Sequence, residues 1–95
     1  MTAIVARRCF ISGRVQGVYY RASARQKAVE LGLSGYACNL EDGRVEVLAV
    51  GEGAAVETMI GWLYVGPPAA KVITVDVQEI ALEELEKVPV GFATR

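Results

Sequence analysis

One nine-residue stretch holds the groups best suited to chemistry: Gly13-Arg14-Val15-Gln16-Gly17-Val18-Tyr19-Tyr20-Arg21. It lies between a strand-like run and a helix-like run, and its two glycines allow a tight turn with backbone N–H groups pointing inward. The first N–H groups of a helix have no partner inside it, so a helix start favours an anion. Arg21 adds a planar guanidinium that binds phosphate or carboxylate through two donors. The stretch therefore predicts an oxyanion-binding loop, with phosphate as the favoured ligand.

The same stretch also has an ordinary structural interpretation. Most glycine-containing loops between a strand and a helix bind nothing, and an arginine in a first helical turn is usually solvated because the helix dipole prefers acidic residues there. The stretch has neither the Gly-Lys-Ser/Thr ending of a P-loop nor the glycine spacing of a dinucleotide-binding loop. From the residues alone, a plain connecting loop remains the alternative.

The rest of the chain offers no conventional catalytic group. It contains no histidine, and neither the two cysteines nor Ser12 and Ser23 have an evident activating base. Cys9 and Cys38 are expected to be packing residues with free thiols, and a zinc or copper site is not predicted. A reaction here must therefore depend on positioning and charge stabilisation. Phosphoryl transfer can work in that way if the leaving group is a weak base, as the carboxylate of an acyl phosphate is.

Length and charge limit the remaining possibilities. The chain has 95 residues, with 10 basic and 11 acidic side chains and a net charge of −1. That balance argues against a nucleic-acid binder, and there is no polybasic run for a membrane surface. The longest uncharged run, residues 58–70, is too short and too interrupted by glycine and proline to span a bilayer. We expect a single domain over residues 1–95, cytoplasmic, monomeric and without cofactor, nucleic-acid partner or membrane partner.

Hydrophobic periodicity predicts the element order βαββαβ. The expected strands are residues 7–13, 33–40, 44–50 and 72–80, and the expected helices are residues 21–31 and 54–64. Residues 1–6 are expected to be a lead-in, and residues 81–95 a short turn with room for an edge strand at 90–93. A right-handed strand–helix–strand crossover makes the first two strands parallel, with the third between them. The prediction is a ferredoxin-like α+β sandwich, a four-stranded antiparallel sheet with both helices on one face.

RNA-recognition domains share this order of elements, but their basic, aromatic-rich strand motif is missing from the expected first and third strands. The topology has a second consequence, which concerns Asn39. Parallel strands end at the same edge of a sheet, so Asn39 should lie about 10 Å of backbone from the loop, across one intervening strand. Its simpler interpretation is a turn-initiating residue before Glu41-Asp42-Gly43, which has hairpin chemistry.

Two motifs resemble the signatures of the acylphosphatase family. The first is Ile11-x-Gly13-x-Val15-Gln16-Gly17-Val18-x-Tyr20-Arg21. The second is Gly35-Tyr36-Ala37-x-Asn39-x-x-x-Gly43-x-Val45, closed by Gly51. The resemblance extends from about residue 8 through the Gly66-Pro67-Pro68-Ala69-Ala70-x-Val72 stretch and the strand after it. Two residues depart from the family pattern: Tyr20 stands where phenylalanine is usual, and Cys38 is an unusual neighbour of Asn39.

The resemblance implies the same fold and a metal-independent hydrolysis of acyl phosphates to a carboxylate and inorganic phosphate. It implies that the phosphate oxygens are bound by the backbone N–H groups of Val15, Gln16, Gly17, Val18, Tyr19 and Tyr20. Arg21 would clamp the phosphate, and Asn39 would hold the attacking water. The alternative is a non-catalytic module of the same fold that binds phosphate or acyl phosphate, which the joint presence of Arg21 and Asn39 disfavours.

Overall fold

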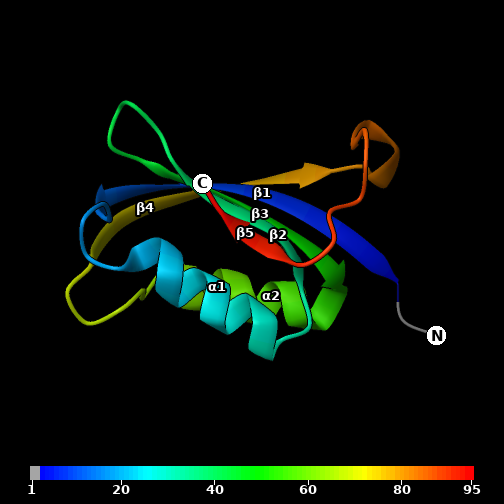
Figure 1. Cartoon of the computed structure of the whole chain (residues 1–95), viewed down its shortest axis with the longest axis horizontal. Helices are drawn as coiled ribbons and strands as arrows, with labels where there is room; N and C mark the ends of the chain where they lie inside the picture. The colour runs from blue at the N-terminus through cyan, green and yellow to red at the C-terminus, as the bar shows by residue number, and fades with distance from the viewer. Residues whose placement is uncertain (1–2) are drawn as a thin grey trace.

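A five-stranded sheet carries two helices on one of its faces in the computed structural model, which describes residues 3–95 (Figure 1). The strands are β1 (Ile4–Arg14), β2 (Ser34–Asn39), β3 (Val45–Glu52), β4 (Lys71–Ile80) and β5 (Phe92–Thr94). The helices are α1 (Tyr20–Glu30) and α2 (Gly53–Leu63), with a single 3-10 turn at Leu82–Glu84. The strand order is β4-β1-β3-β2-β5, antiparallel except for the β2–β5 pair. The ferredoxin-like α+β prediction is confirmed, with β5 as the fifth, parallel edge strand.

The core lies between the sheet and the two helices because alternate strand residues are apolar. Cys9 and Ile11 of β1 pair with Val47 and Val45 of β3, and all four side chains are fully buried. The helices add small residues from α1 and a stripe at helical spacing from α2: Ala24, Ala28, Val56, Met59 and Leu63. This packing fixes the start of α1 against the end of β1.

Two strands, β1 and β3, extend further than the sequence predicts because of pairing across the sheet. β1 begins at Ile4, and residues 4–6 pair with β3, so they are part of the sheet and not a lead-in; residues 1 and 2 lie outside the described residues. β3 continues through Gly51, which pairs with Val5, although glycine there predicted a break. Long-range ladder bonds thus outweigh the local preference of a glycine.

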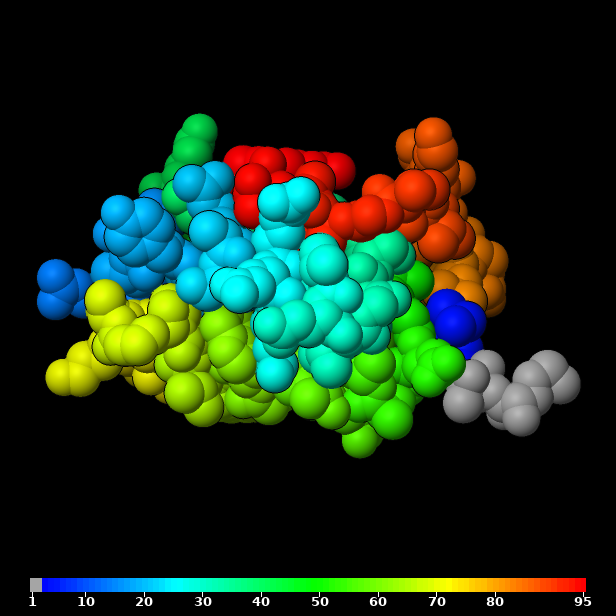
Figure 2. All heavy atoms as spheres, turned by 60° about the horizontal axis from the view of Figure 1, so that its bottom comes forward, coloured from blue at the N-terminus to red at the C-terminus, as the bar shows by residue number. Residues whose placement is uncertain are grey.

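The C-terminal segment, residues 81–95, covers both an edge and a face of the sheet. Leu82 and Leu85 pack with Ala6, Leu48 and Val50 in a second apolar cluster on the face away from the helices. β5 then pairs with β2 and contacts α1 on the other side. Figure 2 shows this end of the chain lying against α1.

Gly35 in β2 supplies a test of the sheet packing. Its φ is 140°, and a Cβ atom there would lie 1.8 Å from the carbonyl oxygen of Leu48 in β3. Gly35→Ala must therefore separate two central strands, and we expect a loss of about 3 kcal/mol or more in the free energy of unfolding. A Cβ atom at Gly61 of α2 would meet no other atom within 4 Å. Gly61→Ala should therefore raise the free energy of unfolding by about 0.5–1 kcal/mol. Urea denaturation measures both, and a Gly35→Ala variant as stable as the parent would contradict the packing.

Candidate active site

The loop between β1 and α1 turns sharply through two left-handed residues. Gly17 has φ 74° and Tyr19 has φ 61°. Residues of positive φ beside residues of negative φ turn successive N–H groups toward one side, which is an anion-binding arrangement. Within residues 3–95, the N–H groups of residues 16–19 donate no backbone hydrogen bond outside the regular elements. The loop thus offers several donors at the start of α1.

Tyr20 anchors that helix start to the core. Its side chain is 1% exposed, and its hydroxyl donates a hydrogen bond of 2.7 Å to the carbonyl oxygen of Leu63 at the end of α2. The ring lies 5.7 Å from the ring of Trp62. Burial raises the pKa of Tyr20, so the hydroxyl stays protonated and remains a donor. The hydroxyl that distinguishes Tyr20 from the family's usual phenylalanine therefore has a partner, one of the carbonyls that a helix end leaves free.

Arg21 follows in the first turn of α1 and is held by the C-terminal segment. Its Nη1 donates a hydrogen bond of 2.5 Å to the main-chain oxygen of Arg95. One turn further on, Nε of Arg25 donates a hydrogen bond of 3.0 Å to the carbonyl oxygen of Phe92. Two arginines of α1 thus donate hydrogen bonds to the backbone of the segment that contains β5. This contact orients the Arg21 guanidinium.

Asn39 ends β2, two strands away from β1, as the topology predicts. It pairs with Val45 of β3, which pairs with Ile11 of β1, so the three residues form one row across the sheet. The Oδ1 atom of Asn39 is buried and has no hydrogen-bond partner within the described chain. The backbone N–H of Asn39 donates to the main-chain oxygen of Arg95 at 3.5 Å. That oxygen therefore contacts both Asn39 and Arg21.

Arg95 is itself held in place by Tyr36 of β2. The guanidinium carbon of Arg95 lies 4.1 Å from the centroid of the Tyr36 ring, and the Tyr36 hydroxyl donates a hydrogen bond to the carboxylate of Glu46. Burial first, and then the hydrogen bond to Glu46, raises the pKa of Tyr36, which keeps the hydroxyl protonated. The sequence carried no signal for Arg95, because only the β2–β5 pairing brings it to the site.

These elements enclose a cavity of about 350 Å³. Its walls come from the loop, the first turn of α1 and the end of β2: Val15, Gly17, Tyr19, Tyr20, Arg21, Ala22 and Asn39. Ala22 is the one lining residue that the sequence analysis did not name. Two residues of the predicted phosphate-binding set, Gln16 and Val18, do not line the cavity; the Val18 side chain is buried in the core.

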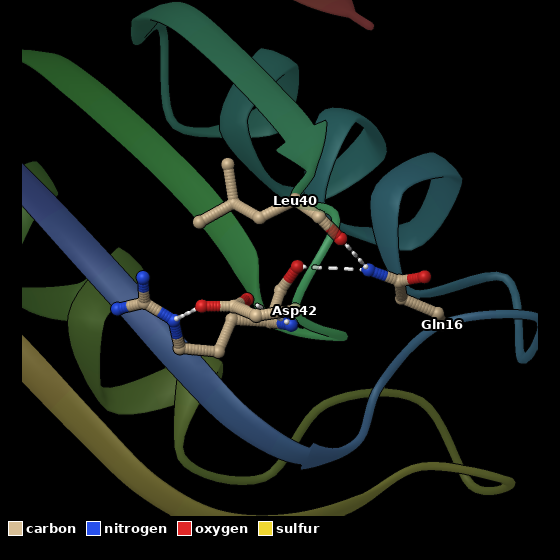
Figure 3. A network of polar contacts seen from close by, with 4 residues as sticks. Gln16, Leu40 and Asp42 are labelled. Carbon is tan, nitrogen blue, oxygen red and sulfur yellow. Dashed lines mark hydrogen bonds and ion pairs between the residues drawn. The ribbon is translucent and has the colours of Figure 1, made fainter.

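The side chain of Gln16 has a different role, which Figure 3 shows. Its Nε2 donates hydrogen bonds to the carbonyl oxygens of Leu40 at 2.8 Å and Arg44 at 3.0 Å. Asp42 closes the turn between them by accepting bonds from the backbone N–H and Nε of Arg44, and these bonds lower the pKa of Asp42. Gln16 thus ties the β1–α1 loop to the hairpin that begins after Asn39.

Gln16→Ala tests these two hydrogen bonds. The change removes one of the two donors to each of these partly buried carbonyl oxygens, which keep a backbone N–H partner. Two hydrogen bonds of about 0.5–1.5 kcal/mol each are lost, so we expect the free energy of unfolding to fall by about 1–3 kcal/mol. Gln16→Glu should be worse near neutral pH, since a carboxylate cannot donate and would face two carbonyl oxygens. Urea denaturation measures each variant, with Gln26→Ala on the exposed surface of α1 as the control. An unchanged free energy of unfolding in both Gln16 variants would show that these hydrogen bonds do not stabilise the fold.

Other reactive groups lie outside the cavity. Both cysteines are free thiols, as predicted, and burial raises the pKa of Cys9 to about 11, so that its thiol is protonated at neutral pH. No group of three or more histidine, cysteine, aspartate or glutamate residues in the described chain could hold a metal ion. Over the same residues, no helix is long and apolar enough to cross a membrane.

Comparisons with known proteins agree with this fold. The acylphosphatase family model matches residues 7–93. The chain is 49% identical over 79 residues to an acylphosphatase of Nitrosococcus oceani, covering 83% of this chain and 89% of the relative. It is similar to the structure of an acylphosphatase from Coxiella burnetii, with a TM-score of 0.86, 39% identity and coverage of 97% and 93% of the two chains. The acylphosphatase structure from Bacillus subtilis gives a TM-score of 0.88, 33% identity and coverage of 96% and 98%.

The fold and these relatives place the chain among small α+β hydrolases that act on acid anhydrides. It belongs to the acylphosphatase family.

Proposed function

We propose that the chain hydrolyses small-molecule acyl phosphates in the cavity between the β1–α1 loop and Asn39. The observation that carries the site assignment is that Arg21 and Asn39, from different elements, line one cavity at the start of a helix. The phosphate is placed against the backbone N–H groups of residues 15–20 and the Arg21 guanidinium, where the positive charge lies. Relatives named acylphosphatase support hydrolysis over the non-catalytic phosphate-binding module.

In the proposed mechanism Asn39 holds the attacking water. Its buried Oδ1 has no partner in the described chain and can accept an O–H of that water. The water oxygen attacks phosphorus in line, the bond from phosphorus to the carboxylate oxygen breaks, and the carboxylate leaves with the electron pair. One proton of the water passes to a phosphate oxygen of the substrate, because none of the described lining residues carries a carboxylate or imidazole base. The weakly basic leaving group needs no general acid.

We expect the reaction to proceed without a metal ion, because Arg21 and the loop N–H groups meet the charge on the phosphate. Hydrolysis of acetyl phosphate should have the same rate before and after saturating chelator. An Arg21→Ala sample purified in parallel reports any contaminating phosphatase. Loss of activity in chelator, with recovery on adding magnesium or zinc, would overturn the metal-free mechanism.

We expect the protein to be a cytoplasmic monomer. We also expect it to bind no nucleic acid, since the net charge of −1 provides no excess of basic side chains. Light scattering at several concentrations measures the oligomeric state. A mass that rises to twice the chain mass would contradict the monomer.

A further inference from the structure

Tyr19 places a large ring at the active-site cavity instead of in the core. The residue is 81% exposed, while its neighbour Tyr20 is 1% exposed. Both line the cavity, but only Tyr19 has its side chain free at the surface. The left-handed backbone of Tyr19 causes this divergence, because it turns the chain at the residue that precedes α1.

The backbone of Tyr19 is the unusual part of this arrangement. Among the described residues it is the one non-glycine position with positive φ, at φ 61° and ψ 24°. A side chain with a Cβ atom pays a steric cost in that region, whereas glycine does not. Strained conformations of this kind cluster at ligand-binding positions. The loop thus combines a left-handed turn with a bulky ring at the same position.

Part of the cavity lining is apolar, so the cavity can contact more than a phosphate. Its 350 Å³ lies in the lower part of the range for small-molecule sites, roughly 300–1,000 Å³. Beyond the Arg21 guanidinium and Asn39, the exposed lining side chains are Tyr19 and Ala22, both apolar in their contact surface. No acidic side chain lines the cavity within the described residues, so a cationic acyl group would find no counter-charge.

We infer that Tyr19 recognises the acyl group, and that the preferred substrates are acyl phosphates with a flat aromatic acyl group that carries no positive charge. This inference rests on the proposed function, since it assigns the part of the cavity next to the bound phosphate. The ring face of Tyr19 stacks on the aromatic acyl group, and the small side chain of Ala22 leaves room beside it. Binding energy from this contact is gained away from the reacting phosphorus and raises kcat/KM.

The test compares benzoyl phosphate with acetyl phosphate across variants. The measured quantity is the ratio of the two kcat/KM values, so the different intrinsic reactivities of the substrates cancel between variants. Tyr19→Asn removes the ring yet tolerates the left-handed backbone, and it should lower the ratio about three- to tenfold, the size of an aromatic contact. Tyr19→Phe keeps the ring face and should keep the ratio. Tyr64→Ala removes a ring that is 54% exposed and does not line the cavity, and it should change neither rate.

Binding without chemistry provides the second measurement. Calorimetric titration with benzoylphosphonate and acetylphosphonate, whose carbon–phosphorus bonds are not hydrolysed, should show the same loss of preference in Tyr19→Asn. An equal loss for both ligands would show that Tyr19 acts through its backbone alone and would overturn the inference. If the parent protein hydrolyses neither acyl phosphate, the proposed function fails; the phosphonate preference then still decides whether Tyr19 contacts the acyl group.

Discussion

Arg21→Ala is expected to lower kcat by about 10²–10³-fold or more and to weaken competitive inhibition by inorganic phosphate. The guanidinium lines the cavity and supplies its positive side chain. In the proposed mechanism it contacts the phosphate in the ground state and more strongly in the transition state, so both quantities should change. Steady-state kinetics with acetyl phosphate, with and without added phosphate, measure them.

Arg25→Ala is the matched control for this variant. Arg21 also holds the main-chain oxygen of Arg95, so its removal loosens the C-terminal segment as well as the site. Arg25 holds the same segment through Phe92 but does not line the cavity. Arg25→Ala should therefore lower the free energy of unfolding as Arg21→Ala does, because both variants loosen the C-terminal segment. It should not cause the large loss of kcat. If phosphate inhibits Arg21→Ala as strongly as it inhibits the parent protein, Arg21 does not contact the bound phosphate.

Asn39→Ala is expected to lower kcat by a comparable factor, about 10²-fold or more, while inhibition by phosphate stays close to that of the parent. The physical reason is that Asn39 is assigned to the water and Arg21 to the phosphate. Oδ1 of Asn39 is buried and unpaired in the described chain, and alanine removes it without touching the loop N–H groups. Circular dichroism checks that the variant is folded.

Asn39→Asp separates catalysis from turn formation. Aspartate initiates turns as well as asparagine does, so a residue that served only the hairpin would tolerate it. In the proposed role, the new carboxylate lies beside the bound phosphate and repels it, so phosphate inhibition should weaken and kcat should fall with it. Full activity in Asn39→Asp would reduce Asn39 to a turn residue, and the loss of phosphate binding in Asn39→Ala would place it in the phosphate cradle.

Local patterns determined a large part of this protein. Hydrophobic periodicity predicted four strands and two helices in the order that the structure shows, because the period of a side-chain pattern follows from backbone geometry. The crossover rule then brought Asn39 to the edge of the sheet that carries the β1–α1 loop. These arguments need only neighbouring residues and the handedness of the chain.

Contacts between distant segments decided the rest. The main-chain oxygen of Arg95 reaches both Arg21 and Asn39 only because β5 pairs with β2. The amide of Gln16 bonds two carbonyl oxygens more than twenty residues away, and no local pattern specifies those partners. The direction of the Tyr19 ring follows from a left-handed φ that a tyrosine adopts rarely on its own. Side-chain identity fixes what a group can donate or accept, but the packing of the sheet against α1 fixes where it does so.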